Sequence, residues 1–553
     1  MAGAPDRQFS FNGAPRGARP GETLLDALAR ERIPVLLRSI RYHRPRAPVC
    51  GLGYCTGCLV RVNGRPNVRA CRHLPEPGDR VVTENSWPST RFDLLGALDY
   101  LFPGGLDTLH GFRRPVWATR AYHRVVRRLA GYGTAPTTAA GRALAGPAVR
   151  RTCDNAIVGG GASGRAATAR LATAGVRPIV LEREVAPADI PGAELFGRTT
   201  VTFLPPRASP DAPFTLLGFT EPGRGVEVRA QRVLVATGGY DAALGFAGND
   251  RPGVLTADGA VALARAGRPP PFSRAVVVGG GPRAEAVLER FGESVEAVVA
   301  PTSITPGVTR RASELGVPLY PRTLVLGATG RARVRSLRLR SRGTGTAFSL
   351  ACDAVILAHR RLPSSQLFFQ AGARMEWRSS PGAYYPVVSA VGETSVPGLF
   401  AVGEAAGDPG PDASGGAERT ADHLLGRLPS VPAPAPGGGD GPSELEGYYR
   451  ELLDEPRRGK WVACPCEDVL LHELEEANRA GYRGIEVVKR YTGLGTGLCQ
   501  GRYCLPDALL LLAILERRPP REVGYITQRP PVSPTPLAAF AAIGEASPET
   551  GGP

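Results

Sequence analysis

The sequence has no long apolar run and almost no lysine. No stretch reaches the roughly 18 apolar residues of a membrane span, and residues 1–13 hold no apolar core of signal-peptide length. The net charge of +16 comes from arginine, because lysine occurs only at positions 460 and 489. There is no lysine-rich tail, and aromatic residues do not interleave with the basic runs, which argues against a nucleic-acid platform. We expect a cytoplasmic globular protein and leave open peripheral association with the inner face of a membrane.

The histidines and two of the ten cysteines show no pattern of catalytic or metal-binding chemistry. The seven histidines form no H-x-x-x-H pair and no His–carboxylate pattern, so we predict no catalytic residue in this chain. Cys153 precedes an expected strand and Cys352 lies within one. Both are most simply explained as buried small side chains.

The other eight cysteines form two sets of four, near opposite ends of the chain. The first set reads C-x4-C-x2-C-x12-C and the second reads C-x-C-x32-C-x4-C. In a cytosolic protein cysteines more often bind metal than form disulfides, and four thiolates can hold a 2Fe–2S cluster with two ligands per iron. We therefore predict two 2Fe–2S clusters. The predicted ligands are Cys50, Cys55, Cys58 and Cys71 for the first cluster, and Cys464, Cys466, Cys499 and Cys504 for the second.

The N-terminal set begins with the spacing of a plant-type ferredoxin loop. Zinc sites favour paired C-x2-C knuckles, so the pattern favours a cluster over zinc or buried thiols. Gly51, Gly53 and Gly57 let the loop turn its amides toward the cluster without a Cβ clash. Upstream, residues 9–13 read as a strand and residues 22–33 as an amphipathic helix, as a β-grasp ferredoxin fold requires.

The C-terminal set is expected to lie beside two helices, over residues 467–479 and 506–517, each following a cysteine pair. Sulfurs at helix N-termini would have their negative charge stabilised by the helix dipole. Zinc, or a redox disulfide in the C-x-C pair, is the alternative.

Residues 153–184 read as a strand, a glycine turn, a helix, a strand and a terminal acid. In such a G-x-G-x-x-G turn the glycines allow a tight turn, the close approach of a pyrophosphate and helix packing, and the helix N-terminus faces the phosphates. The acid can accept from ribose hydroxyls. The predicted dinucleotide contacts are Gly159, Gly161, Ala162, Ser163, Gly164 and Glu182.

Two later strands favour FAD over NAD for this site. In residues 232–241 an apolar strand ends in Ala-Thr-Gly, which contains Thr237 and Gly238. In residues 399–408 a strand ends in Gly403 and Glu404. These patterns resemble flavin reductases with two dinucleotide domains, which imply ribityl and phosphate contacts here, usually with Asp where this chain has Glu404. Only 55 residues separate Glu182 from Thr237, and the usual glycine-rich turn and helix after the acid are missing. FAD is therefore expected in a more open site or in one completed by a partner, and an empty site is the alternative.

A second glycine motif lies in residues 273–292, where Gly279, Gly281 and Ala284 give G-x-G-x-x-A. The strand that follows ends in Pro301 and Thr302, with no acid to hold a ribose. Arg310 and Arg311 come too late for a clear 2′-phosphate site. NAD(P) binding and a structural relic of the fold both remain open.

Several segments resemble one family along nearly the whole chain. RSIRYHRPRAP (38–48), which could otherwise be a solvated basic run, resembles the alpha subunit of heterotetrameric sarcosine oxidase, and residues 111–136 resemble the linker of that family. In that family these segments pack between domains. VKRYTGLGTGLCQGRYC (488–504) resembles alpha subunits of D-hydroxyproline dehydrogenase, opine oxidases and hydrogen cyanide synthase, and TQRPPVSPTPL (527–537) resembles the tail of the family.

The resemblance implies an α/β multidomain fold. It would hold a β-grasp ferredoxin-like domain, a flavoprotein core of two Rossmann-like domains, and a small helical C-terminal domain similar to bacterioferritin-associated ferredoxin. It further implies an oxidoreductase subunit that relays electrons from a D-amino-acid-oxidase-type flavoprotein beta subunit, where an amine or imino acid is oxidised. A stand-alone NAD(P)H-dependent reductase and a non-redox scaffold are the alternatives.

The expected domain boundaries follow from these motifs. They are 1–95 for the ferredoxin domain, 96–150 for a linker, 151–265 and 366–428 for the two parts of the FAD domain, 266–365 for the NAD(P)-like domain, 429–459 for a Pro/Gly-rich linker, and 460–553 for the C-terminal cluster domain.

Overall fold

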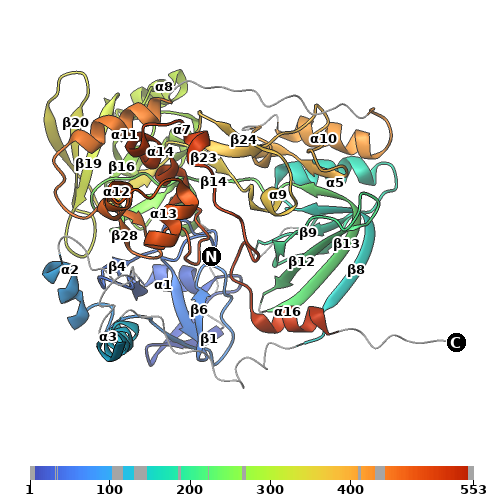
Figure 1. Cartoon of the computed structure of the whole chain (residues 1–553), viewed down its shortest axis with the longest axis horizontal. Helices are drawn as coiled ribbons and strands as arrows, with labels where there is room; N and C mark the ends of the chain where they lie inside the picture. Colours follow the sequence, from blue (N-terminus) through green and yellow to red (C-terminus); the bar gives the residue numbers. More distant parts are fainter. Residues whose placement is uncertain are drawn as a thin grey trace. The chain divides into compact units, whose positions relative to one another are not determined.

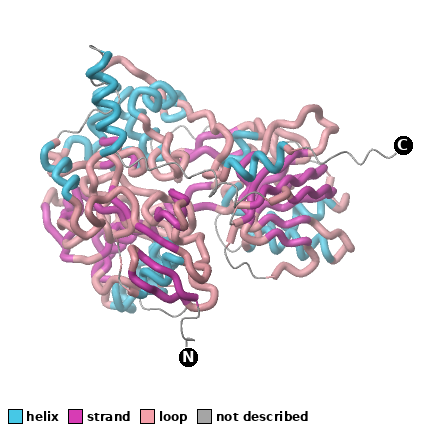
Figure 2. The backbone as a smooth tube through the Cα atoms, turned by 90° about the horizontal axis from the view of Figure 1, so that it is seen from below, coloured by secondary structure: helices cyan, strands magenta, loops and turns pink. Residues whose placement is uncertain are grey.

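The computed structural model describes residues 7–31, 33, 35–102, 116–129, 146–184, 189–221, 223–264, 270–408, 413–429 and 443–545. The chain divides into two compact units, each of which contains helices and strands (Figures 1 and 2). Unit 1 comprises residues 1–136, 241–361 and 442–526, and unit 2 comprises residues 137–240, 362–441 and 527–553.

Unit 1 begins with a five-stranded sheet in the order β2-β1-β7-β5-β6. Its elements are β1 (Arg7–Phe11), β2 (Ala14–Ala18), α1 (Leu24–Arg30), β5 (Leu59–Val62), β6 (Arg65–Arg69) and β7 (Arg80–Val82). α1 starts after Thr23, whose hydroxyl accepts from the Asp26 N–H while the Asp26 carboxylate accepts from the Thr23 N–H. Leu24 and Leu28 of this helix are fully buried. The expected strand and helix of a β-grasp domain are therefore present.

The middle part of unit 1 is a parallel sheet in the order β15-β22-β16-β17-β18, which carries the second glycine motif. Its elements are β15 (Val254–Thr256), α6 (Ala257–Leu263), β16 (Ala275–Val278), α7 (Pro282–Phe291), β17 (Val295–Val299), α8 (Pro306–Leu315), β18 (Leu319–Tyr320) and β22 (Ala354–Leu357). Every residue of β16 and β22 is buried, as expected for a parallel sheet covered on both faces. One hydrophobic core contains residues of this sheet and of the ferredoxin sheet.

One further sheet completes this part of the chain. An antiparallel sheet consists of β19 (Thr323–Thr329), β20 (Ser336–Ser341) and β21 (Ala347–Ala351). Residues 241–264, which the expected boundaries placed with the FAD domain, lie in unit 1 because β15 pairs with β22.

The C-terminal part of unit 1 is mainly helical and carries the second cysteine set. Its elements are α11 (Glu444–Asp454), β27 (Val462–Cys464), β28 (Val469–Leu470), α12 (Leu471–Arg479), α13 (Ile485–Thr492) and α14 (Leu505–Glu516). The helix expected over 467–479 begins instead at Leu471, because β27 and β28 form a hairpin in which Asp468 has a positive φ of 51°. The helix expected over 506–517 is α14.

Unit 2 contains a seven-stranded mixed sheet in the order β10-β9-β8-β13-β12-β11, with β26 also paired to β13. Its elements are β8 (Val149–Val158), α5 (Ala162–Ala172), β9 (Ile179–Leu181), β10 (Glu194–Phe196), β11 (Thr199–Phe203), β12 (Phe214–Thr220), β13 (Arg224–Val235), β26 (Leu399–Ala401) and α10 (Ala413–Leu424). β8, β9, β10 and β26 run parallel to their neighbours. α16 (Leu537–Gly544) packs on β13. This is the dinucleotide-binding layer expected for the first glycine motif.

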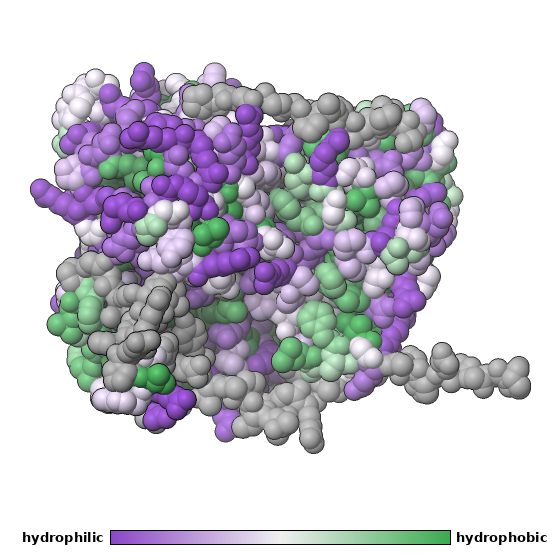
Figure 3. All heavy atoms as spheres, in the orientation of Figure 1, coloured by the Kyte–Doolittle hydropathy of each residue, from purple (hydrophilic) through white to green (hydrophobic). Residues whose placement is uncertain are grey.

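Parts of the expected linkers lie outside the described residues. Of the segment 111–136, only α3 (Val116–Leu129) is described, and it follows α2 (Leu98–Leu101) in the chain. Residues 430–442 of the Pro/Gly-rich linker are not described. Among the described residues no helix is long and apolar enough to cross a membrane. On the face drawn in Figure 3, hydrophilic side chains surround scattered apolar areas.

Candidate functional site

The N-terminal cysteines gather at one end of the ferredoxin sheet. Cys50, Cys55 and Cys58 lie on the loop that leads into β5, and Cys71 follows β6. All four are buried, and the sulfurs of Cys58 and Cys71 are 3.5 Å apart. Hydrogen bonds from the Cys50 and Cys58 thiols hold the pKa of Cys55 well below its usual value. The loop and the segment after β6 therefore bring together the four cysteines that the spacing predicted.

The backbone of this loop supports a thiolate-rich site. The N–H groups of Leu52 and Cys55 donate to the Cys50 sulfur at 3.4 and 3.3 Å. A Cβ at Gly57 would lie 1.9 Å from the Ala47 carbonyl oxygen. Gly57 is therefore required by the close approach of the chain to itself.

The C-terminal cysteines gather between the β27–β28 hairpin and the start of α14. Cys464 ends β27, Cys466 lies in the hairpin, and Cys504 directly precedes α14. Hydrogen bonds from Cys466 and Cys504 hold the pKa of Cys464 well below its usual value, and a hydrogen bond from Cys466 lowers the pKa of Cys499. Cys466 is half-buried and the other three are buried. The expected position at a helix N-terminus holds for Cys504, whereas Cys466 lies in the turn between β27 and β28.

The donor atoms of both sets fit a 2Fe–2S cluster, which requires four thiolates divided between two irons. Each set offers four neighbouring cysteine sulfurs. Among the described side chains, no group of three or more His, Cys, Asp or Glu residues is placed to hold a single metal ion.

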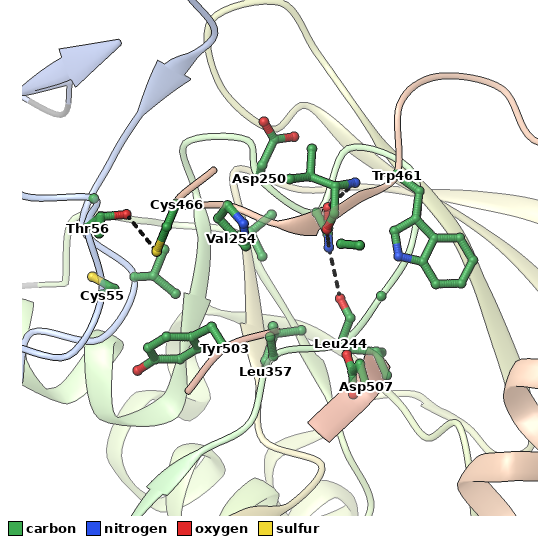
Figure 4. A pocket seen from close by; sticks show the side chains of 18 of the residues that line it. Cys55, Thr56, Leu244, Asp250, Val254, Leu357, Trp461, Cys466, Tyr503 and Asp507 are labelled. Carbon is green, nitrogen blue, oxygen red and sulfur yellow. Dashed lines mark hydrogen bonds between the residues drawn. The ribbon is translucent and has the colours of Figure 1, made fainter. Parts of the chain in front are cut away.

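The two cysteine sets adjoin one another inside unit 1. The Thr56 hydroxyl, between Cys55 and Cys58 in the chain, donates to the Cys466 sulfur at 3.5 Å (Figure 4). A cavity of about 60 Å³ is lined by Cys55 and Cys466 together. The sequence separates these residues by about four hundred positions, and no local pattern predicted that they would meet.

The arginine run 38–48 explains how the two sets are held together. Arg44 donates to both carboxylate oxygens of Asp250 at 2.7 Å, and Arg46 binds Asp250 and Asp468. Burial alone would raise the pKa of Asp250, but the Arg44 and Arg46 charges outweigh it and hold that pKa below its usual range. Arg41 pairs with Glu473 at 2.7 Å. The run is therefore a buried ion-pair network and is not solvated.

The first glycine turn has the geometry that a dinucleotide requires. Gly159 has a φ of 109°, and a Cβ there would lie 2.3 Å from the Ala236 carbonyl oxygen. A Cβ at Gly164 would lie 2.0 Å from the Gly159 carbonyl oxygen, which is the close helix packing expected of the third glycine. A Cβ at Gly161 meets nothing within 4 Å, so the turn is open where a pyrophosphate would approach. Ala162 and Ser163 begin α5 directly beside it.

The other predicted FAD residues lie around this turn in unit 2. The Glu182 carboxylate accepts from the Gly160 N–H. The Thr237 hydroxyl donates to the Ser364 carbonyl at 3.1 Å, and the Glu404 carboxylate accepts from the Gly239 N–H at 2.9 Å. Gly238 and Gly403 both have a φ of 63°. Between Glu182 and Thr237 the described residues form strands and no helix, so the segment is as reduced as the sequence predicted.

The second glycine turn repeats this backbone in unit 1. Gly279 has a φ of 154°, and a Cβ there would lie 2.3 Å from the Ala358 carbonyl oxygen. A Cβ at Gly281 meets nothing within 4 Å, and Ala284 is fully buried. No acid follows β17, where the chain continues with Ala300, Pro301 and Thr302. The Thr305 N–H donates to the Gly280 carbonyl at 2.8 Å.

The two arginines after this turn are engaged elsewhere. Arg310 pairs with Glu285 at 3.4 Å and Arg311 pairs with Glu314 at 2.8 Å. These ion pairs agree with the expectation that neither arginine forms a clear 2′-phosphate site.

Three families match separate parts of the chain. Residues 7–86 match a 2Fe-2S iron-sulfur cluster binding domain, residues 207–421 match the pyridine nucleotide-disulphide oxidoreductase family, and residues 459–544 match the sarcosine oxidase A3 domain. These matches support a 2Fe–2S cluster in the N-terminal domain and FAD in the dinucleotide-binding fold.

Two known proteins are similar to this chain over nearly its whole length. The structure of L-proline dehydrogenase from P. horikoshii matches 96% of this chain and 96% of its own chain, with a TM-score of 0.64 and 19% sequence identity. This similarity confirms the predicted fold class. The sarcosine oxidase subunit alpha of Rhizobium meliloti (strain 1021) is 28% identical over 96% of this chain, which spans 57% of that subunit's length. The hydrogen cyanide synthase subunit HcnA of Pseudomonas aeruginosa is 40% identical over 16% of this chain and 80% of its own length. The chain thus belongs to the family of sarcosine oxidase alpha subunits and hydrogen cyanide synthase subunits, with the 2Fe–2S domain at its N-terminal end.

Proposed function

We propose that the chain is the electron-transfer alpha subunit of a heteromeric amine or imino-acid dehydrogenase or oxidase. The contact between the two cysteine sets carries this proposal, because clusters bound by the two sets would lie next to each other. The open glycine turn at Gly161 supplies a place for FAD in the same chain. A flavin can accept an electron pair and iron–sulfur clusters carry single electrons, so the combination suits a relay.

The cysteines are proposed as the cluster ligands, four in each set, and the second 2Fe–2S cluster is part of this proposal. In unit 2, the open side of Gly161 and the N-terminus of α5 would receive the FAD pyrophosphate. Glu182, already hydrogen-bonded to the turn, would orient the ribose. Gly238 and Glu404 complete the proposed contacts.

The substrate and partner are proposed from the relatives, of which the sarcosine oxidase subunit is almost twice as long as this chain. Amines of the sarcosine, proline or hydroxyproline, opine or glycine type are the proposed substrate class. We place their oxidation on a D-amino-acid-oxidase-type flavoprotein beta subunit, in a cytoplasmic hetero-oligomer. The net charge of +16 suits a partner with an acidic surface.

A stand-alone NAD(P)H-dependent reductase is the second candidate. The second glycine turn favours it, because Gly281 is as open as Gly161. The missing acid after β17 and the loop bonded to Gly280 argue against it.

The test compares the lone chain with the chain co-expressed with its flavoprotein partner, both prepared anaerobically. Sarcosine, proline, an opine or glycine added to the complex should reduce the clusters and support dye-linked dehydrogenase activity, and the lone chain should do neither. A Cys55→Ser complex should lose reduction of the N-terminal cluster while its partner still oxidises amine. Amine oxidation by the lone chain at the rate of the complex would contradict the proposal, and bleaching of the lone chain by NADH would favour the reductase.

A further inference from the structure

The contact between Thr56 and Cys466 joins the two cysteine loops at a single side chain. Thr56 belongs to the N-terminal loop, yet its hydroxyl donates to a sulfur of the C-terminal set. Cys466 is the least buried cysteine of that set. Figure 4 shows the hydroxyl aimed at this sulfur, with the Cys55 side chain close to both.

The flanks of both cysteine sets are joined as well, which makes the contact part of a built interface within unit 1. Arg46, just before Cys50, binds Asp468, just after Cys466. Arg69, just before Cys71, donates to the Leu498 carbonyl at 3.0 Å, and Leu498 precedes Cys499.

A third contact joins the same two sets. The guanidinium of Arg502, just before Cys504, lies 4.8 Å from the centre of the Tyr54 ring, which precedes Cys55. A cation at that distance is attracted to the ring face. Three independent contacts therefore fix the loops that surround Thr56.

The N-terminal loop has little freedom to move away from Cys466. The Gly57 backbone, next to Thr56, packs directly on the Ala47 carbonyl. The cavity beside Thr56 has a volume of about 60 Å³, which holds only a few water molecules. The hydroxyl therefore stays within reach of the sulfur.

We propose that the two sets form one two-cluster relay and that Thr56 is the positioning residue that sets the reduction potential of the C-terminal cluster. This rests on the proposed function only in requiring a cluster in each set. In the transfer, one cluster loses one electron and the other gains it, and no bond or proton changes. Hydrogen bonds to the sulfurs are one determinant of cluster potential. A donor to Cys466 stabilises the added negative charge of the reduced cluster and raises its potential.

The test uses the full chain in its complex and anaerobic redox titrations followed by EPR. Cys499→Ser identifies the C-terminal signal. Thr56→Val keeps the shape of the side chain but removes the hydroxyl, and Thr56→Ser keeps the hydroxyl. Thr56→Val should shift the electron distribution away from the C-terminal cluster about tenfold, which is 59 mV for one electron. Thr56→Ser should stay near wild type. Equal potentials in Thr56→Val and wild type would overturn the role of Thr56.

A second readout tests whether the clusters adjoin. With both clusters reduced, spin–spin interaction should split the EPR lines of the wild type, and Cys499→Ser should remove the splitting. About four irons per chain with two unsplit signals would overturn the relay while leaving the cluster content of the proposed function intact. A C-terminal set that binds no iron would overturn both.

Discussion

The two glycine turns share one backbone and differ in the residues that surround it. In each, the first glycine packs on a carbonyl at the end of the neighbouring strand, Ala236 for Gly159 and Ala358 for Gly279. In each, the second glycine is open. The similarity shows that the glycines alone define the turn and do not define its ligand.

Two arginines beside the second turn form ion pairs. Ser163 lies two residues after the open glycine of the first turn, whereas the matching Arg283 binds Asp241 at 2.9 Å and Asp258 at 2.7 Å. At the strand end, Gly238 of the first site corresponds to Arg360 of the second, which pairs with Asp507 in the first turn of α14. The second turn thus supports the C-terminal cysteine domain, whereas the first leaves room for a cofactor.

Breaking the Arg360–Asp507 pair should give the largest effect. Both residues are buried, and removing one partner of a buried pair costs about 3–5 kcal/mol. Asp507→Ala should lower the free energy of unfolding by this amount in urea titrations and should reduce iron in the C-terminal set. Arg311→Ala, in the more exposed pair with Glu314, is the control and should cost less than about 1 kcal/mol. Equal effects for the two variants would contradict the supporting role of the second turn.

The same substitution in the two turns should separate their ligands. Gly161→Val should lower flavin occupancy at least tenfold, because the new side chain fills the space where the pyrophosphate would approach. It should leave the thermal unfolding temperature of the flavin-free protein nearly unchanged, since nothing lies within 4 Å of its Cβ. Gly281→Val is the matched control and should leave flavin content unchanged. Full flavin in Gly161→Val would show that the first turn is structural only.

Substitution of Glu182, the acid that only the first turn has, should give a smaller effect. Glu182→Gln keeps the size of the side chain but weakens its hydrogen bond to the Gly160 N–H and the proposed bond to a ribose hydroxyl. One such bond contributes about 1 kcal/mol. FAD should therefore bind about five-fold more weakly in fluorescence titrations of the apoprotein. An unchanged FAD affinity would remove Glu182 from the proposed contacts.

The smallest effect is expected from NADH. Because no acid follows β17 and the loop at Thr305 is bonded to the turn, NADH should reduce the lone chain no faster in wild type than in Gly281→Val. Stopped-flow spectra of the flavin under anaerobic conditions measure this rate. A saturable NADH-dependent reduction that Gly281→Val abolishes would assign a nucleotide to the second turn.

The sequence predicted what short segments determine. The cysteine spacings, both glycine turns and the N-terminal strand and helix depend on residues close in the chain. The expected strand 9–13 is β1, two residues earlier, and the expected helix 22–33 is the shorter α1. The contact between Thr56 and Cys466 spans 410 positions and leaves no periodic pattern. The start of α12 was misplaced for the same reason, because Asp468 is held by arginines from the other end of the chain. Charges that pair across such distances look like solvated charges in the sequence.

The bond between Arg46 and Asp468 also has a meaning for biosynthesis. The two residues are 422 positions apart. Because a ribosome adds about 5–20 residues per second, Asp468 is synthesised roughly 20–80 s after Arg46. Throughout that time the loop that carries Cys50, Cys55 and Cys58 lacks the hairpin that later packs against it. The contact between the two cysteine sets therefore forms late in synthesis. The first cysteine set is synthesised well before the hairpin that packs against it.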